Sequence, residues 1–388
     1  MLFSFAMMIL VGVVFAMIMR KVGLPNLLGY LLTGIILGPF VFNVIDTTTF
    51  QISSDIRQIA LMIILMRAGL NLQISDLKKV GSSALLMCFV PASFEILGLM
   101  ILAPIFLHLD LLNAAILGTV LAAVSPAVVV PLMLRLMDEG YGTKEGIPQL
   151  IMAGASMDDV YVIVLFTSLL TLAKSGEFNA LSLLRIPTSI LSGIVLGYVL
   201  CKLYRLLKLP TGIELASMFA IGMVLITIER IMTGMIGFSG LLAIMALTAT
   251  IRHIKPEMAD KYSAVLAKLW QPAEIFLFAL VGASVRIDYA LSFGPVVLVV
   301  IILALIFRML GVYLSIMKTK FNMKERIFTM GAYLPKATVQ AAIGGLALEA
   351  GLASGELILT AAVTAILFTA PLGAIFISLT YRSFLQKV

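Results

Sequence analysis

The sequence predicts an all-α polytopic membrane protein with about thirteen transmembrane helices. Of its 388 residues, 61% are hydrophobic and only 12% are charged, which is about half the charged share of a soluble domain. Apolar runs long enough to cross a bilayer recur along the whole chain, separated by polar or Gly/Pro breaks. Two of these runs are interrupted by proline, which predicts inverted repeats with two broken, crossing helices.

The predicted spans follow the apolar runs in order, and only the ninth is short. They cover residues 1–19, 24–44, 57–74, 80–107, 112–137, 147–173, 184–208, 212–233, 237–252, 264–287, 291–316, 325–349 and 355–382. In the first run the charges, Arg20 and Lys21, follow the apolar segment, whereas a signal peptide has them in front. We therefore expect a first transmembrane helix here, not a cleaved leader.

The distribution of positive charge predicts how the spans are oriented. With the N-terminus outside, nineteen Lys and Arg residues fall on the cytoplasmic side and five on the outer side. This bias predicts an integral protein of the plasma (inner) membrane with a cytoplasmic C-terminus, in contact with the lipid bilayer. It also accounts for the net charge of +7 without a nucleic-acid partner.

The residues that carry most enzyme chemistry are scarce. The chain has two cysteines and two histidines, too few for a disulfide framework or a metal cluster, and no nucleotide-binding glycine loop. We expect neither an enzyme nor a bound cofactor.

Six charged residues lie inside predicted spans, one of them, Arg67, near the inner end of its span. They are Glu95, Asp158, Asp159, Arg67, Arg308 and Lys336. An aspartate at the bilayer centre costs about 2.5–3.5 kcal/mol on insertion scales. Three acids and three bases predict partners that offset one another's desolvation.

Asp158 and Asp159 are adjacent in the sixth span and are the main candidates for binding a small cation and, alternately, protons. Sodium and lithium prefer hard oxygen ligands such as carboxylates. Neighbouring residues on a helix point about 100° apart, so the two carboxylates should have unequal roles. We expect Asp159 to be the main cation ligand and proton carrier. Asp158 would be a second ligand or the partner of a basic residue.

Prolines predict breaks inside the fifth and twelfth spans. Pro126 and Pro131 interrupt the fifth, and Pro335 interrupts the twelfth. Glu95 precedes Pro126 by 31 residues, and Arg308 precedes Pro335 by 27, which suggests two related units of opposite orientation. Lys336 would offset the carbonyls at a half-helix C-terminus. Glu95 would neutralise N-terminal ends or pair with a cation.

Three motifs resemble a known family. Residues 24–39 (LPNLLGYLLTGIILGP) resemble the opening signature of the cation/proton antiporter superfamily. The stretch Ser125 to Pro131, followed by Ser156-Met157-Asp158-Asp159, resembles the NHA subfamily of sodium/proton antiporters, as does LPKATVQAAIG at 334–344. The resemblance covers nearly the whole chain.

The resemblance implies a NhaA/NapA-type fold and a homodimer. Residues 80–173 and 291–382 would form the two halves of a mobile core domain, and 1–74 and 184–287 the scaffold and dimerisation helices. Asp158 and Asp159 match the family's ion-binding pair, and Arg308 matches the basic residue that faces it. Further matches at polar or crossover positions are Glu95, Pro126 and Lys336.

Smaller polar side chains near the motifs could contact the ion or simply bond backbone and neighbouring helices. They are Ser125, Ser156, Thr338 and Gln340. Many electrogenic relatives carry lysine where this chain has Arg308. Because arginine does not lose its proton, we expect one-for-one, electroneutral exchange.

Three other functions stay open. A potassium/proton antiporter or potassium-efflux system of the same superfamily is disfavoured by the double aspartate and by the lack of a nucleotide-binding regulatory domain. A passive cation channel would need a continuous pore. A sodium-coupled organic anion symporter would need a larger apolar pocket, which sequence does not exclude.

Overall fold

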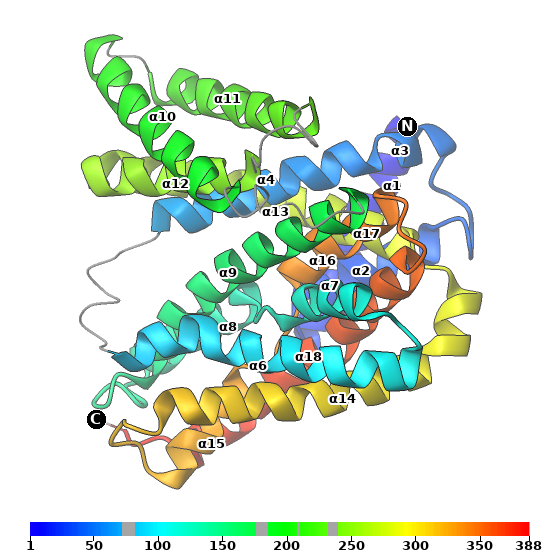
Figure 1. The fold of residues 1–388 in the computed structure, drawn as a ribbon, viewed down its shortest axis with the longest axis vertical. Helices are drawn as coiled ribbons and strands as arrows, with labels where there is room; N and C mark the ends of the chain where they lie inside the picture. Colours follow the sequence, from blue (N-terminus) through cyan, green and yellow to red (C-terminus); the bar gives the residue numbers. More distant parts are fainter. Residues whose placement is uncertain (72–81, 176–184, 208–209, 232–239, 388) are drawn as a thin grey trace. The chain divides into compact units, whose positions relative to one another are not determined.

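The computed structural model describes all residues except 72–81, 176–184, 208–209, 232–239 and 388 (Figure 1). The described residues are helical apart from connecting loops and one isolated β-bridge between Tyr141 and Lys387. They divide into two compact units. The first comprises Met1–Ser54, Ser75–Phe166 and Ile275–Val388, and the second comprises Asp55–Ile74 and Thr167–Glu274. The candidate site lies in the first unit.

The first unit begins with α1 (Leu2–Lys21), α2 (Asn26–Leu37) and the short α3 (Thr47–Gln51). Helices α1 and α2 pack so closely that a Cβ atom on Gly29 would lie 2.5 Å from the backbone nitrogen of Ala16. Helix α2 ends seven residues before the predicted end at residue 44. The reason is Gly38-Pro39, because proline lacks the N–H that a continuing helix would need.

Two long helices of the first unit, α6 (Ser82–Leu107) and α14 (Ile287–Ile316), lie side by side (Figure 1). Glycine permits this contact, since a Cβ atom on Gly311 would lie 2.8 Å from the Cα of Pro91. Helix α6 carries Glu95 and α14 carries Arg308, and both residues are buried. The close packing therefore places a buried acid and a buried base on facing helices.

Both predicted broken helices are present in the first unit. The fifth span consists of α7 (Leu111–Ala122) and α8 (Pro126–Asp138). The twelfth consists of α15 (Met323–Ala332), α16 (Thr338–Gly344) and the one-turn α17 (Leu346–Glu349). Helix α18 (Gly355–Phe384) packs against α7, α8, α14, α15 and α16.

The first break differs in detail from the prediction. It falls at residues 123–125, and Pro126 is the first residue of α8, where its missing N–H costs nothing. Pro131 lies inside α8 and the helix continues across it, so the expectation that both prolines interrupt the span is wrong for Pro131. A single proline is tolerated in a membrane helix when neighbouring groups satisfy the freed carbonyl.

The remaining helices lie wholly or partly in the second unit. They are α4 (Ser53–Asn71), α9 (Ile147–Ser175), α10 (Arg185–Leu207), α11 (Thr211–Ile231), α12 (Gly240–Ile254) and α13 (Pro256–Ala283). The division between the units falls within α9, which carries Asp158 and Asp159 on its first-unit part, and within α13. Within the second unit, α12 packs against α10 and α11. Helix α13 begins eight residues before the predicted start at 264, because a membrane helix can extend through a charged turn into water.

The membrane character is confirmed, whereas the count of thirteen spans stays a prediction. Within the described residues, eight helices are long and apolar enough to cross a membrane, and three further apolar helices are shorter. The segments predicted as a core domain, 80–173 and 291–382, lie largely in the first unit together with α1 and α2. Their separation into a mobile core and a scaffold stays a prediction.

Candidate functional site

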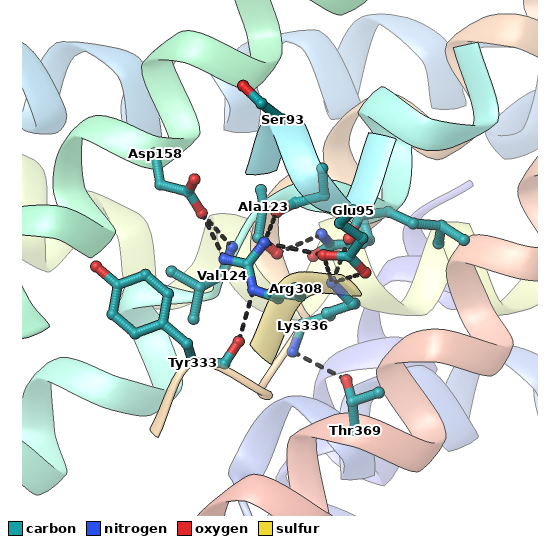
Figure 2. Close-up of polar contacts among 12 residues, drawn as sticks. Ser93, Glu95, Ala123, Val124, Asp158, Arg308, Tyr333, Lys336 and Thr369 are labelled. Carbon is teal, nitrogen blue, oxygen red and sulfur yellow. Dashed lines mark hydrogen bonds and ion pairs between the residues drawn. The ribbon is translucent and has the colours of Figure 1, made fainter. Parts of the chain in front are cut away.

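Four buried charges from distant parts of the sequence meet in the first unit (Figure 2). They are Glu95 on α6, Asp158 on α9, Arg308 on α14 and Lys336 in the break between α15 and α16, and none is more than 1% exposed. We call these four residues the charge cluster. The sequence pointed to each of them, and the fold brings them together.

Glu95 bridges the two basic residues of the charge cluster. Its Oε1 lies 2.7 Å from Nζ of Lys336, and its Oε2 accepts from Nη1 of Arg308 at 2.9 Å. The expectation that Glu95 pairs with a cation is met twice. A carboxylate at this depth is stable only when its charge is paired and its oxygens are hydrogen-bonded.

Arg308 uses all three nitrogens of its guanidinium group. Nη2 donates to Oδ2 of Asp158 at 2.7 Å, and Nε donates to the backbone carbonyl of Tyr333 at 2.8 Å. Nη1 donates to Glu95 and to the carbonyl of Ala122. The planar fork of arginine suits such multiple contacts better than lysine does.

The formal charges of the cluster cancel, because two carboxylates face two cations. Asp159 stands outside this balance. It is 5% exposed and forms no ion pair within the described part of the chain. The two adjacent aspartates therefore have unequal surroundings: Asp158 is tied to Arg308, whereas Asp159 has no basic partner among the described residues.

The charge cluster also satisfies the broken backbone of the fifth span. Carbonyls at the C-terminal end of α7 accept from side chains: Leu121 from Lys336, Ala122 from Arg308, and Ala123 from Gln340 at 2.8 Å. The N–H of Val124 donates to Oδ2 of Asp158 at 2.9 Å. Unwound backbone at membrane depth needs such partners. The expected role of Lys336 at a half-helix C-terminus matches this contact.

The two breaks cross each other directly. The N–H of Ser125 donates to the carbonyl of Pro335 at 2.8 Å. Next to this contact, the backbone N–H of Lys336 donates to Oγ1 of Thr369 on α18 at 3.0 Å (Figure 2). The two interrupted helices therefore meet at their breaks.

Several buried oxygens around the crossing have no hydrogen-bond partner among the described residues. They are Oδ1 of Asp158, Oδ1 of Asp159, Oγ of Ser125 and Oε1 of Gln340. Leaving a buried polar group unsatisfied costs about 1–3 kcal/mol, so each open oxygen needs an explanation. Carboxylate, hydroxyl and amide oxygens are the hard donors that a small monovalent cation prefers.

The other predicted site residues are placed less informatively. Pro126 begins α8, and Thr338 begins α16 and is buried. Ser156 lies within α9, but its side chain is outside the described part of the structure.

Sequence reasoning missed Tyr333, Thr369 and the backbone groups of residues 121–124, all of which contact the charge cluster or the break. Tyr333 had a signal, because it lies two residues before Pro335. The backbone groups had none beyond the predicted position of the break.

Comparisons with known proteins bear on the whole chain. The family model described as "Sodium/hydrogen exchanger, transmembrane" matches residues 6–382. Sodium/hydrogen exchanger 9B2 from Homo sapiens is 35% identical over 382 residues, covering 94% of this chain and 70% of that protein. Sodium/hydrogen exchanger 9B1 from Homo sapiens is 36% identical over 371 residues, covering 91% and 71%.

A solved structure shares the fold. The sodium proton antiporter MjNhaP1 from Methanocaldococcus jannaschii superposes with a TM-score of 0.82 over 98% of this chain and 97% of the other, at 19% sequence identity. This likeness confirms an antiporter-type fold.

Proposed function

Because the chain belongs to the sodium/hydrogen exchanger family, we propose that it is a secondary active antiporter that exchanges sodium or lithium for protons by alternating access. The observation that carries this proposal is Asp159, a buried carboxylate without an ion pair among the described residues. It directly follows Asp158, which accepts from the N–H of Val124 at the break. Ser125 and Gln340 at the same break offer further open oxygens.

Competition for Asp159 is the proposed basis of exchange. The ionised carboxylate binds a sodium ion, and the protonated carboxylate has lost the charge that attracts it. Either occupant neutralises Asp159, which lowers the cost of holding the group inside a low-dielectric protein. The site then changes its exposure from one side of the membrane to the other with one occupant or the other bound.

The other oxygens have supporting roles in this proposal. Asp158, Ser125 and Gln340 complete the coordination of the cation, with Ser156 and Thr338 as further candidates. Arg308 and Lys336 hold Asp158, Glu95 and the broken backbone in place. Pro126 fixes the start of α8 beside the site.

Charge balance supports one-for-one, electroneutral exchange. The two carboxylates and two basic groups of the charge cluster balance one another. Asp159 is therefore the carboxylate at which a proton and a sodium ion would replace each other. Arg308 keeps its proton, and Lys336 is held by Glu95 and the carbonyl of Leu121. One sodium ion would therefore replace one proton.

The wider assignment is part of the same proposal. We place the protein in the NHA subfamily, as a homodimer in the plasma (inner) membrane with its N-terminus outside. The relatives' names describe exchangers, that is, transporters and not enzymes. Transport of this kind needs no cofactor besides the exchanged ions.

The test is a transport assay in reconstituted vesicles with an imposed pH gradient. Addition of sodium or lithium should change the lumenal pH, and Asp159→Asn should abolish the response, by at least about 100-fold, because the amide cannot exchange a proton. Asp288→Asn is the matched control, since this carboxylate is exposed and paired with Arg286.

Each possible result of this assay supports or contradicts one part of the proposal. No cation-driven pH change in the wild type contradicts antiport, and a response to potassium alone would indicate a potassium/proton antiporter. A response that survives Asp159→Asn contradicts the assigned site. With the membrane potential clamped at different values, an electroneutral exchanger should show the same rate at each, and a voltage-dependent rate contradicts one-for-one exchange.

A further inference from the structure

Tyr333 has an unusual position beside the charge cluster. Its side chain is fully buried, its ring lies under the guanidinium of Arg308 at 5.4 Å, and its backbone carbonyl accepts from the same side chain. Its hydroxyl, however, has no hydrogen-bond partner among the described residues. Phenylalanine would fill this position without leaving a buried polar atom unsatisfied.

The hydroxyl reaches the helix that carries the aspartates. A Cβ atom on Gly154 would lie only 1.9 Å from the hydroxyl oxygen of Tyr333, so the two residues are in direct contact. Gly154 and Asp158 are four residues apart on α9 and therefore lie on the same helix face, one turn apart. Figure 2 shows the Tyr333 ring extending towards the helix that bears Asp158.

Asp158 also has an open atom. Its Oδ2 accepts both from Arg308 at 2.7 Å and from the N–H of Val124 at 2.9 Å. Its Oδ1 is buried and without a partner in the described structure. The Tyr333 hydroxyl, which contacts α9 at Gly154, and Oδ1 of Asp158, one turn further along α9, are thus both without a partner among the described residues. One water molecule between them would satisfy both, as buried waters commonly do.

We propose that Tyr333 is a positioning residue of the transport site, whose hydroxyl holds the free oxygen of Asp158 through one bridging water molecule. This proposal rests on the proposed function, because Asp158 matters only if the site binds a cation. Arg308 and Val124 fix one oxygen of the carboxylate, and Tyr333 fixes the other. The carboxylate then presents a defined orientation to a cation bound at Asp159.

Tyr333→Phe separates the hydroxyl from the ring. The ring keeps its packing and its contact with Arg308, while Asp158 loses the second hold on its carboxylate. We expect the sodium concentration for half-maximal transport to rise about threefold to tenfold, the effect of one typical hydrogen bond. The maximal rate should change by less than about twofold, and the melting temperature should stay the same or rise.

Tyr161→Phe is the matched control. Tyr161 lies three residues after Asp158 on the same helix, but its hydroxyl is already paired with Ser93 at 2.7 Å. Removing this hydroxyl should lower the melting temperature and leave the half-maximal sodium concentration unchanged. Tyr333→Phe should therefore change the sodium requirement without loss of stability, whereas Tyr161→Phe should lose stability without a change in the sodium requirement.

Gly154→Ala tests the same contact from the other side. The added methyl group must displace the Tyr333 hydroxyl, so this variant should be less stable and should also need more sodium. Combining it with Tyr333→Phe removes the colliding oxygen. The double variant should regain part of the lost stability but keep the raised sodium requirement, which distinguishes loss of the hydroxyl from loss of packing.

The outcomes separate this inference from the proposed function. A wild-type protein without sodium-driven proton movement contradicts the function itself. An active wild type with an unchanged half-maximal sodium concentration in Tyr333→Phe contradicts the role of the hydroxyl alone. If Tyr333→Phe does not fold, Gly154→Ala provides the test, because it displaces the hydroxyl while keeping the tyrosine. An unchanged sodium requirement in Gly154→Ala then contradicts the inference.

Discussion

Two buried polar networks in this protein can be compared, one in each unit. In the first unit, the charge cluster joins four ionisable side chains to broken backbone. In the second unit, the carboxylate of Glu214 accepts from the hydroxyl of Tyr262 at 2.7 Å. The backbone carbonyl of Glu214 accepts from Tyr204 at 3.0 Å and from Ser217 at 2.8 Å.

The difference lies in what each network leaves open. The hydroxyls around Glu214 all have partners, on regular helices α10, α11 and α13. Around the charge cluster, by contrast, oxygens of Asp158, Asp159, Ser125 and Gln340 have no partner in the described structure. A closed network stabilises a fold, whereas an open one retains acceptors for a ligand. Burial of polar groups alone therefore does not identify a transport site.

The largest expected effect is on the charge cluster. Arg308→Met would leave Asp158 and the carbonyls of Ala122 and Tyr333 without their donor and would leave Glu95 with Lys336 alone. Breaking a buried pair in this way should destabilise the protein by about 3–5 kcal/mol. Thermal unfolding in detergent would measure it, with Arg382→Met as an exposed control. A stability loss no larger than the control's would contradict the structural role assigned to Arg308.

A smaller effect is expected in the second unit. Tyr262→Phe removes the hydroxyl that donates to the buried carboxylate of Glu214 and should cost about 1–3 kcal/mol. Because no fully buried side-chain oxygen of this network lacks a partner in the described structure, sodium dependence of transport should not change. Unfolding and vesicle transport should be measured on the same preparation. A shifted sodium requirement in Tyr262→Phe would remove the contrast drawn between the two networks.

The smallest effect concerns an exposed carboxylate at the start of α7. Asp110 caps this helix: its carboxylate accepts a hydrogen bond from the backbone N–H of Asn113 at 2.9 Å. This hydrogen bond holds the pKa of Asp110 below its usual value. As pH falls, the unfolded chain binds the proton first. The stabilisation is thus present above about pH 4 and is lost as pH falls through the lowered pKa of the folded state.

Asp110→Asn keeps a capping oxygen but cannot titrate, so its stability should fall by about 0.5 kcal/mol less than that of the wild type between pH 7 and pH 3. Unfolding at the two pH values measures this difference. Equal pH dependence in both proteins would show that the titration of Asp110 does not contribute. Transport at neutral pH should be the same in Asp110→Asn and in the wild type. This pair therefore shows how small the effect is when the carboxylate lies outside both networks.

Much of the candidate site was predictable because charge is expensive in a membrane. Glu95, Asp158, Asp159, Arg308 and Lys336 stood out as ionised residues within apolar runs, and proline marked both interruptions. The pairing was not predictable. Sequence could not decide whether Arg308 would hold Asp158, Glu95 or both, because helix packing sets which side chains meet.

Sequence by itself determined that this chain is a helical membrane protein with two interrupted helices and an excess of buried charge. Hydropathy and proline act locally and can be read residue by residue. Only the tertiary structure decided that α6 and α14 bring Glu95 to Arg308, that the crossing breaks receive Lys336 and Gln340, and that Asp159 remains unbalanced. These outcomes depend on contacts between residues as many as 241 positions apart, and no local pattern in the sequence records them.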